Sequence, residues 1–272
     1  FYDITVSDTT DTLWVYSNDP EQPSRLRLKI DFFDDDYGEC TGLVSDEIFT
    51  PLPDAKIYFF YYGIYLFDST FTDIAGNYSL QLPAGNYTVA TEKEGYRVMF
   101  SGNTSDPYFA QSVLLDSGQT INVDLALPSI KNTGLSVSGI LIDSVYGTPI
   151  NKGVVVVRKG THTPTLLKPN LLSADSSVYA GFVRSDGRYN INVEDSTYYF
   201  VQGYSDYFLP TYYNNQNATS VFWQNADSVF INQTTANKNL YLERDSSYGG
   251  GGAYGSITLP FLEAQELDGI TV

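Results

Sequence analysis

Apolar and polar residues alternate with a period of two along most of this chain. The clearest example lies in residues 71–96, where two alternating segments, 77–82 and 86–90, flank a Pro-Ala-Gly turn at 83–85. Alternation on both sides of a short turn is typical of two half-buried β-strands. The pattern therefore predicts a β-hairpin in this stretch.

The same alternation predicts two or three further strands in residues 1–32. Two of them cover segments 13–16 and 26–32, and a loop rich in Ser, Asn, Asp and Pro at 17–23 separates them. A hairpin of this size does not bury enough apolar surface to fold alone. We therefore expect residues 1–36 to be terminal strands that either belong to a partial domain or are donor strands that pair elsewhere.

Three short segments occur twice in the same order, which indicates an internal repeat. The pairs are 41–46 with 138–143, 52–57 with 148–154, and 72–79 with 184–191. Each copy contains about seven predicted short strands, the number expected of a β-sandwich. The sequence thus predicts two sandwich modules, at residues 37–128 and 134–243, joined by a brief link.

Beyond the second module, residues 244–252 form a glycine-rich linker. Residues 253–272 are predicted to be the opening strands of a third module or donor strands. Because the sequence starts with Phe1, we expect it to be an excerpt of a longer chain. Unpaired strands near both ends favour pairing with another chain.

Composition agrees with an all-β fold and limits the partners. The chain has 23 Tyr and 16 Phe among 272 residues, and no segment keeps helical apolar spacing over several turns. A formal net charge of -17 disfavours nucleic acids and anionic membranes as partners. No apolar run reaches the length of a membrane span, so we expect no membrane insertion.

Candidate catalytic residues are few. Cys40 is the single cysteine, which excludes an intrachain disulfide, and His162 is the single histidine. One imidazole cannot build the common zinc sites, and a catalytic triad would need other residues to converge on it. We predict a buried, unreactive Cys40, a loop position for His162, and no enzymatic activity.

An acidic segment precedes the first module. Asp34, Asp36 and Glu39 surround Gly38 and offer oxygen ligands to Ca²⁺. Their spacing differs from that of an EF-hand loop and lacks its closing Glu. The alternative is a solvated acidic linker, and no other cofactor is predicted.

Aromatic residues give a second set of candidate contacts. Segment 57–62 is apolar or aromatic on both strand faces, so a loop, a neighbouring domain or another subunit must cover one face. Tyr61 and Tyr62 are therefore candidates for subunit contact. Tyr212, Tyr213 and Trp223 are candidates for a platform that stacks on sugars, and packing of the same rings in a core is the alternative.

These motifs resemble known families. Residues 42–96, with a G-x-V-x-D-like strand, the "TDIAGNY" motif and a "PAGNYTV...GY" return, resemble the carboxypeptidase regulatory-like (transthyretin-like) β-sandwich. Residues 138–213 are similar but depart from the Pro-x-Gly element at 194–197, and residues 207–242 resemble the tail of secreted bacterial versions. Residues 13–30 resemble the closing strands of a hydin or abnormal-spindle type of immunoglobulin-like domain.

The resemblance implies tandem immunoglobulin-like or transthyretin-like sandwiches in a long exported bacterial chain, without catalytic residues of their own. We therefore expect a noncatalytic structural protein, extracellular or at the cell surface. Its expected partners are adjacent domains or other copies of itself, with strand exchange into a filament as one mode of assembly. The alternatives are a carbohydrate-binding or adhesin module with a glycan partner, and an accessory region of a secreted hydrolase.

Overall fold

The computed structural model describes residues 10–16, 25–31, 37–61, 65–160 and 178–245. These residues form β-strands and connecting turns, and the helical elements that they contain are short 3-10 turns such as η1 (Pro107–Phe109) and η3 (Trp223–Asn225). The predicted all-β fold class is confirmed. No helix in the described ranges has the length and apolar character that a membrane span needs.

The first two strands form a sheet of their own. β1 (Thr10–Tyr16) and β2 (Arg25–Asp31) pair antiparallel, with Leu13 opposite Leu28. Among the described residues no third strand joins this sheet. The strand expected near the start of the chain and the loop at 17–23 lie outside the described residues.

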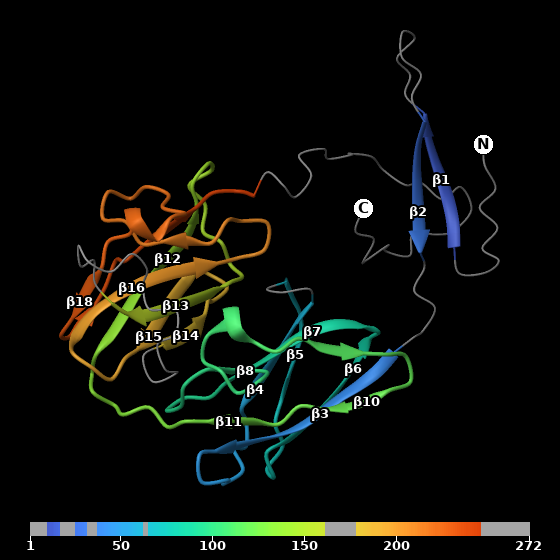
Figure 1. Cartoon of the computed structure of the whole chain (residues 1–272), viewed down its shortest axis with the longest axis horizontal. Coiled ribbons are helices and arrows are strands. Elements are labelled where there is room, and N and C mark those ends of the chain that lie inside the picture. The colour runs from blue at the N-terminus through green and yellow to red at the C-terminus, as the bar shows by residue number, and fades with distance from the viewer. Residues whose placement is uncertain (1–9, 17–24, 32–36, 62–64, 161–177, 246–272) are drawn as a thin grey trace.

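Residues 37–127, the N-terminal sandwich, form two sheets (Figure 1). In the first, β3 (Tyr37–Asp46) pairs with β6 (Asn77–Pro83) on one side and, in parallel, with β10 (Thr120–Asn122) and β11 (Leu125–Leu127) on the other. The second contains β5 (Tyr65–Phe71), β4 (Lys56–Tyr61), β7 (Gly85–Glu92), β8 (Met99–Phe100) and β9 (Val113–Leu115).

Residues 136–242, the C-terminal sandwich, repeat this plan strand for strand. Its first sheet contains β12 (Ser136–Asp143), β15 (Arg188–Asn192), β19 (Thr234–Thr235) and β20 (Leu240–Leu242). Its second contains β14 (Val178–Phe182), β13 (Val154–Lys159), β16 (Thr197–Tyr204), β17 (Thr211–Tyr212) and β18 (Val229–Ile231). The described strands number nine in each sandwich, two more than the seven expected.

A glycine and a tyrosine interlock in the same way in both sandwiches. Gly42 lies opposite Tyr78, and a Cβ atom at Gly42 would lie 2.0 Å from the carbonyl oxygen of Val123. The Tyr78 hydroxyl donates a hydrogen bond of 2.6 Å to that same oxygen. Gly139 and Tyr189 repeat this arrangement in the C-terminal sandwich. The two repeated motifs therefore have the same structural role.

The predicted hairpin at residues 77–90 is wrong. β6 pairs with β3 and β7 pairs with β4, so the turn at 83–85 carries the chain from one sheet to the other. Alternation shows which face of a strand is buried but not which strand lies beside it. Leu82 and Val89 both point into the core between the two sheets, as the alternation requires.

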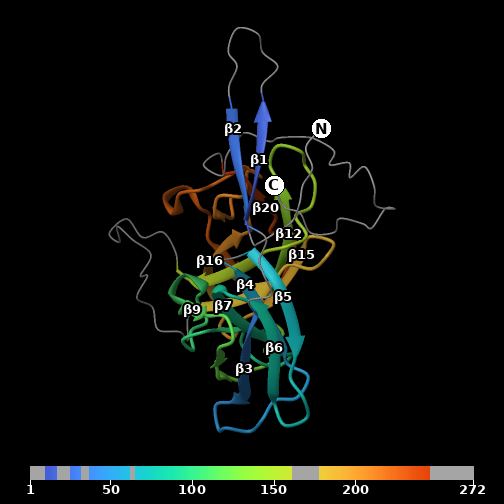
Figure 2. The same ribbon diagram turned by 90° about the vertical axis from the view of Figure 1, so that its right-hand side faces the viewer.

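The described residues form three apolar clusters. One lies between the two sheets of each sandwich. The third, which we call the junction core, lies between the β4-containing sheet of the N-terminal sandwich and the β13-containing sheet of the C-terminal sandwich. Figures 1 and 2 both show the two sandwiches side by side. The chain therefore buries apolar surface between its sandwiches as well as within them.

Candidate functional site at the junction of the two sandwiches

The junction core forms because two strands are apolar on both faces. On β4, Ile57 and Phe59 point into the N-terminal sandwich, whereas Tyr58 and Phe60 point into the junction core. The four consecutive valines of β13, residues 154–157, divide between two cores in the same way. The sequence predicts that something must cover the outer rings of segment 57–62, and the neighbouring sandwich covers Tyr58 and Phe60.

Phe182 of β14 lies at the centre of the aromatic contacts across the junction. Its ring centroid lies 4.0 Å from that of Tyr58, 5.9 Å from Phe60 and 6.4 Å from Phe100. Aromatic side chains bury large areas, and their pairs add stability beyond the area that they bury. The C-terminal sandwich thus inserts one ring among three rings of the N-terminal sandwich.

A buried ion pair borders the junction core, and we call it the Arg158 clamp. Arg158 of β13 donates to both carboxylate oxygens of Asp106, at 3.0 Å from Nε and 2.7 Å from the terminal nitrogen. The same guanidinium donates to Gln202 at 2.8 Å and to the Tyr204 hydroxyl at 3.3 Å. Asp106 belongs to the N-terminal sandwich and also accepts the Tyr108 N–H at 3.0 Å. The clamp joins the two sandwiches.

The Arg158 guanidinium keeps its charge despite burial. The side chains of Arg158 and Asp106 are only 11% and 6% exposed. Burial alone lowers the pKa of Arg158, but Tyr204 and the Asp106 carboxylate outweigh this effect and hold it above its usual range. Removing one member of a buried ion pair leaves the other charge without compensation. Arg158 and Asp106 therefore each need the other to compensate a buried charge.

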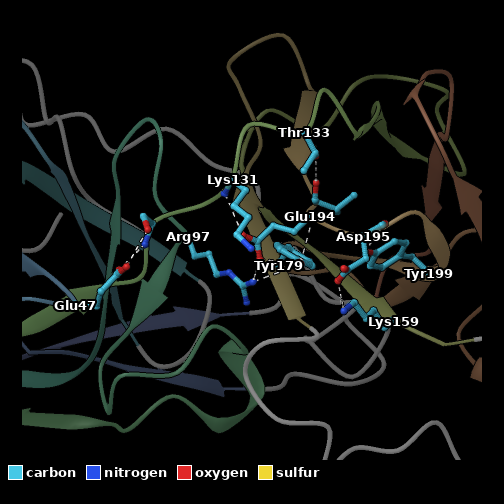
Figure 3. Close-up of polar contacts among 11 residues, drawn as sticks. Glu47, Arg97, Lys131, Thr133, Lys159, Tyr179, Glu194, Asp195 and Tyr199 are labelled. Carbon is cyan, nitrogen blue, oxygen red and sulfur yellow. Dashed lines mark hydrogen bonds and ion pairs between the residues drawn. The ribbon is translucent and has the colours of Figure 1, made fainter.

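A second ion pair lies beside the junction, and we call it the Arg97 clamp (Figure 3). Its cation belongs to the N-terminal sandwich, whereas the cation of the Arg158 clamp belongs to the C-terminal sandwich. Arg97 of the N-terminal sandwich pairs with Glu194 of the C-terminal sandwich, and its guanidinium carbon lies 4.5 Å from the centre of the Tyr179 ring. The Lys131 N–H donates to the Glu194 carboxylate at 3.0 Å. Burial raises the pKa of Glu194, but the Lys131 N–H and Arg97 lower it by more. The pKa of Glu194 therefore lies below its usual range.

The link between the sandwiches, residues 128–135, is bonded to both of them. The Ser129 N–H and hydroxyl donate to the Glu47 carboxylate of the N-terminal sandwich at 2.6 and 2.9 Å. The Thr133 hydroxyl donates to the Val193 carbonyl of the C-terminal sandwich at 2.7 Å. Fixing the link at each end restricts the relative movement of the sandwiches.

A groove of about 840 Å³ opens beside the Arg97 clamp. Residues of both sandwiches line it, including the edge strands β14 and β15 and the turn after β7. Its charged lining residues are Asp54, Glu92, Lys93, Glu94, Arg97 and Arg184. The groove carries charges of both signs, and Arg97 and Tyr179 form part of its wall.

The predicted calcium ligands are only partly described. Asp34 and Asp36 lie outside the described residues. Glu39 lies on β3, where its carboxylate accepts a hydrogen bond from the Ser79 hydroxyl of β6. The described residues contain no group of three or more His, Cys, Asp or Glu side chains placed to hold a metal ion. The calcium site stays a prediction.

The predicted sugar platform does not include Tyr213, which is a correction. Tyr213 is only 7% exposed and packs in the core of the C-terminal sandwich, so core packing was the right alternative for this ring. Tyr212 on β17 and Trp223 in η3 are half-buried. They stay candidates for contact with a ligand or a subunit.

Of the other two candidate contacts, Tyr61 is half-buried and its ring lies 5.3 Å from that of Tyr87 in the same sandwich. Tyr62 lies outside the described residues, as does His162. Cys40 is buried as predicted, and burial raises the pKa of its thiol to about 11. A thiol with this pKa is not a reactive nucleophile at neutral pH.

Sequence reasoning missed the four clamp residues, and only one of them had a signal. Arg158 continues the two-residue spacing of Val154 and Val156, so its place on the outer face of β13 follows from alternation. Asp106 lies in a loop of polar residues and Glu194 lies in a turn, where carboxylates are common. Their pairing depends on how the sandwiches dock, which no local pattern encodes.

Comparisons with known proteins do not assign a family. A scan against protein-family models gives no match, and a search of curated proteins gives none either. Among solved structures, a streptococcal ancillary pilin is 13% identical over 89% of this chain and 73% of that chain, with a TM-score of 0.28. The Bacillus anthracis TIE protein is 12% identical over 85% and 39%, with a TM-score of 0.29. The shaft pilin SpaA from Lactobacillus rhamnosus GG is 11% identical over 77% and 98%, with a TM-score of 0.24. Likeness at this level assigns no function.

Proposed function

We propose that this chain is a noncatalytic structural segment of a bacterial extracellular or cell-surface protein, in which two sandwiches act as one stiff unit. The observation that carries the proposal is the junction core with the two ion-pair clamps beside it. Domains of one chain move relative to each other by default unless their interface is large and apolar. Here an apolar core, two ion pairs and a bonded link all restrict that movement.

The chemistry of the described residues supports a noncatalytic role. Cys40 is buried with a raised pKa, and the buried Asp106 and the half-buried Glu194 are paired with arginines. Asp46 and Asp73 bond to backbone N–H groups in their own turns. These side chains stabilise turns and interfaces, which is the usual work of such residues in a structural domain.

Repeated backbone features support assignment of both sandwiches to the carboxypeptidase regulatory-like type. Gly76 and Gly187 occupy equivalent turns with φ of 77° and 80°. The carbonyl of each accepts a hydrogen bond from the strand that carries the G-x-V-x-D-like motif, at Val44 and Leu141. The proposed extracellular bacterial location rests on this likeness, and the formal net charge of -17 agrees with it.

The stiffness of the pair can be tested by ¹⁵N relaxation on the full chain. We expect the amides of both sandwiches to report one rotational correlation time, as for a single body. A Phe182→Asp variant, which places a charge in the junction core, should shorten the correlation times and let them differ between the sandwiches. Separate tumbling of the two sandwiches in the wild-type chain would refute the proposal.

The proposal includes assembly through β1 and β2. These strands form a two-stranded sheet with unpaired edges in the described structure, and such edges pair readily with strands of another chain. We expect larger particles as the concentration of the full chain rises, in sedimentation velocity and in electron micrographs. A chain that lacks residues 1–31 should stay monomeric, and equal association of the two forms would exclude this mode of assembly.

A further inference from the structure

We infer that the two clamps together form a charge register that permits only one docking of the sandwiches. This inference depends on the proposed stiff pair, because it concerns how that pair is aligned. It assigns to Arg97, Asp106, Arg158 and Glu194 the recognition of one sandwich by the other.

The apolar contacts of the junction do not by themselves select one alignment. The junction core packs Tyr58 and Phe60 of one sandwich against Phe182, Val154 and Val156 of the other. Apolar burial has no preferred direction, and apolar side chains of similar size can repack after a shift. Alignment therefore has to come from groups with directional partners.

The order of charges supplies this alignment. The N-terminal sandwich presents a cation, Arg97, and an anion, Asp106. On the C-terminal sandwich, Glu194 faces Arg97 and Arg158 faces Asp106. Moving one sandwich by the distance between the clamps brings Arg97 to Arg158, or Asp106 to Glu194. Either shift places like charges together at a buried interface, which is a repulsive element against the wrong alignment.

The C-terminal sandwich holds its arginine in place with its own side chains. Arg158 bonds to Gln202 and to the Tyr204 hydroxyl, and Tyr204 in turn donates to Gln202 at 2.6 Å. On the other side, Asp106 is held by the N–H of Tyr108. Groups that are ordered before contact lose less conformational freedom on docking and bind more selectively. The Arg158 clamp is thus formed from two side chains that are already oriented.

The register is tested by the distance between two nitroxide spin labels on the full chain, one on each sandwich. The labels are attached to cysteines introduced by Ile74→Cys and Gln216→Cys. Both positions are exposed, lie in turns and are far from the clamps in sequence. Cys40 is 1% exposed and needs no replacement. The wild-type background should give one narrow distance distribution in pulsed electron paramagnetic resonance.

Reversing one charge should change this distribution while the sandwiches stay folded. Arg158→Glu faces Asp106 with a like charge and should give a shifted or second distance, and Asp106→Arg combined with Arg158→Asp should restore the original one. The matched control is Arg188→Glu, at an exposed pair with Asp186, which should leave the distance unchanged. If Arg158→Glu does not fold, Glu194→Arg and its swap with Arg97→Glu are measured in the same way.

The outcomes separate this inference from the proposed function. A broad distribution in the wild-type background would contradict the stiff pair itself. A narrow wild-type distribution that Arg158→Glu and Glu194→Arg both leave unchanged would preserve the stiff pair and overturn the register. Failure of both charge swaps to restore the distance in folded variants would also overturn it.

Discussion

At the scale of single residues, a glycine in each sandwich lets two strands and a tyrosine meet. Gly42 and Gly139 have no room for a Cβ atom, because a backbone carbonyl and a tyrosine ring fill the space. The sequence repeats both the glycine and the tyrosine, so their equivalence was predictable. Their mutual contact was not, since it requires the register between β3 and β6.

Gly42→Ala should lower the free energy of unfolding by about 3 kcal/mol, because the new methyl group would collide with a backbone carbonyl that cannot move aside. Urea denaturation measures the change. The control is Gly118→Ala, where φ is 68° and no atom lies within 4 Å of the added group, so only about 1–2 kcal/mol is expected from backbone strain. Equal effects of the two substitutions would contradict the steric account.

Glu194 should make the junction sensitive to acid. Its pKa in the folded state lies below the ordinary value of 4.5, so its ionised form stabilises the fold above that pH, and this stabilisation is lost as the pH falls through the lowered pKa. Glu194→Gln should therefore reduce stability at pH 7 and flatten its decline below about pH 4.5.

Asp186→Asn is the control for this substitution, since Asp186 lies in an exposed pair with Arg188. Its stability should change by less than about 0.5 kcal/mol at pH 7. Denaturant titrations between pH 7 and pH 3 supply the comparison. A Glu194→Gln curve parallel to that of the wild-type chain would show that this carboxylate is not linked to folding.

At the scale of elements, alternation predicted most strands but not their neighbours. Segments 77–82 and 86–90 were correctly predicted as half-buried strands, yet they belong to different sheets. The apolar character of both faces of β4 correctly predicted a covering partner. What covers a face, and which strand lies beside another, depend on contacts between distant residues that a local pattern does not contain.

The turn that changes sheets should depend on a tyrosine hydroxyl. The Tyr87 hydroxyl donates to the Pro83 carbonyl at 2.8 Å, and Tyr199 repeats this bond to Asp195 at 2.9 Å. Tyr87→Phe and Tyr199→Phe should each lower the free energy of unfolding by about 1 kcal/mol in denaturant titrations, the typical net value of one hydrogen bond.

The matched control for these substitutions is Tyr198→Phe, because Tyr198 is 46% exposed and precedes Tyr199 on the same strand. We expect it to change stability by less than about 0.5 kcal/mol. If all three substitutions had the same effect, the hydroxyl bond at the turn would have no special role.

At the scale of the whole molecule, the central feature is that two sandwiches share a third apolar core. The sequence predicted the repeat and the need to cover outer rings. It did not predict that the equivalent sheets of the two copies would face each other. That arrangement depends on contacts between residues of both sandwiches, which single-strand patterns cannot reveal.

Phe182→Ala should lower the stability of the full chain by about 3 kcal/mol, because it removes the ring that packs among three aromatic side chains. Phe71 holds the equivalent position in the N-terminal sandwich and is 59% exposed. Phe71→Ala should therefore have a much smaller effect. Chemical denaturation measures the loss of stability in both variants. A larger loss for Phe182→Ala would come from packing in the junction, because both residues hold the same position in the repeat.

Differential scanning calorimetry of the full wild-type chain tests the shared core most directly. If the sandwiches unfold as one unit, a single transition is expected, with a calorimetric enthalpy close to the van't Hoff enthalpy. Phe182→Ala should separate this transition into two. Two well-resolved transitions in the wild-type chain, unchanged by Phe182→Ala, would show that the sandwiches fold independently and would contradict a junction core that unites them.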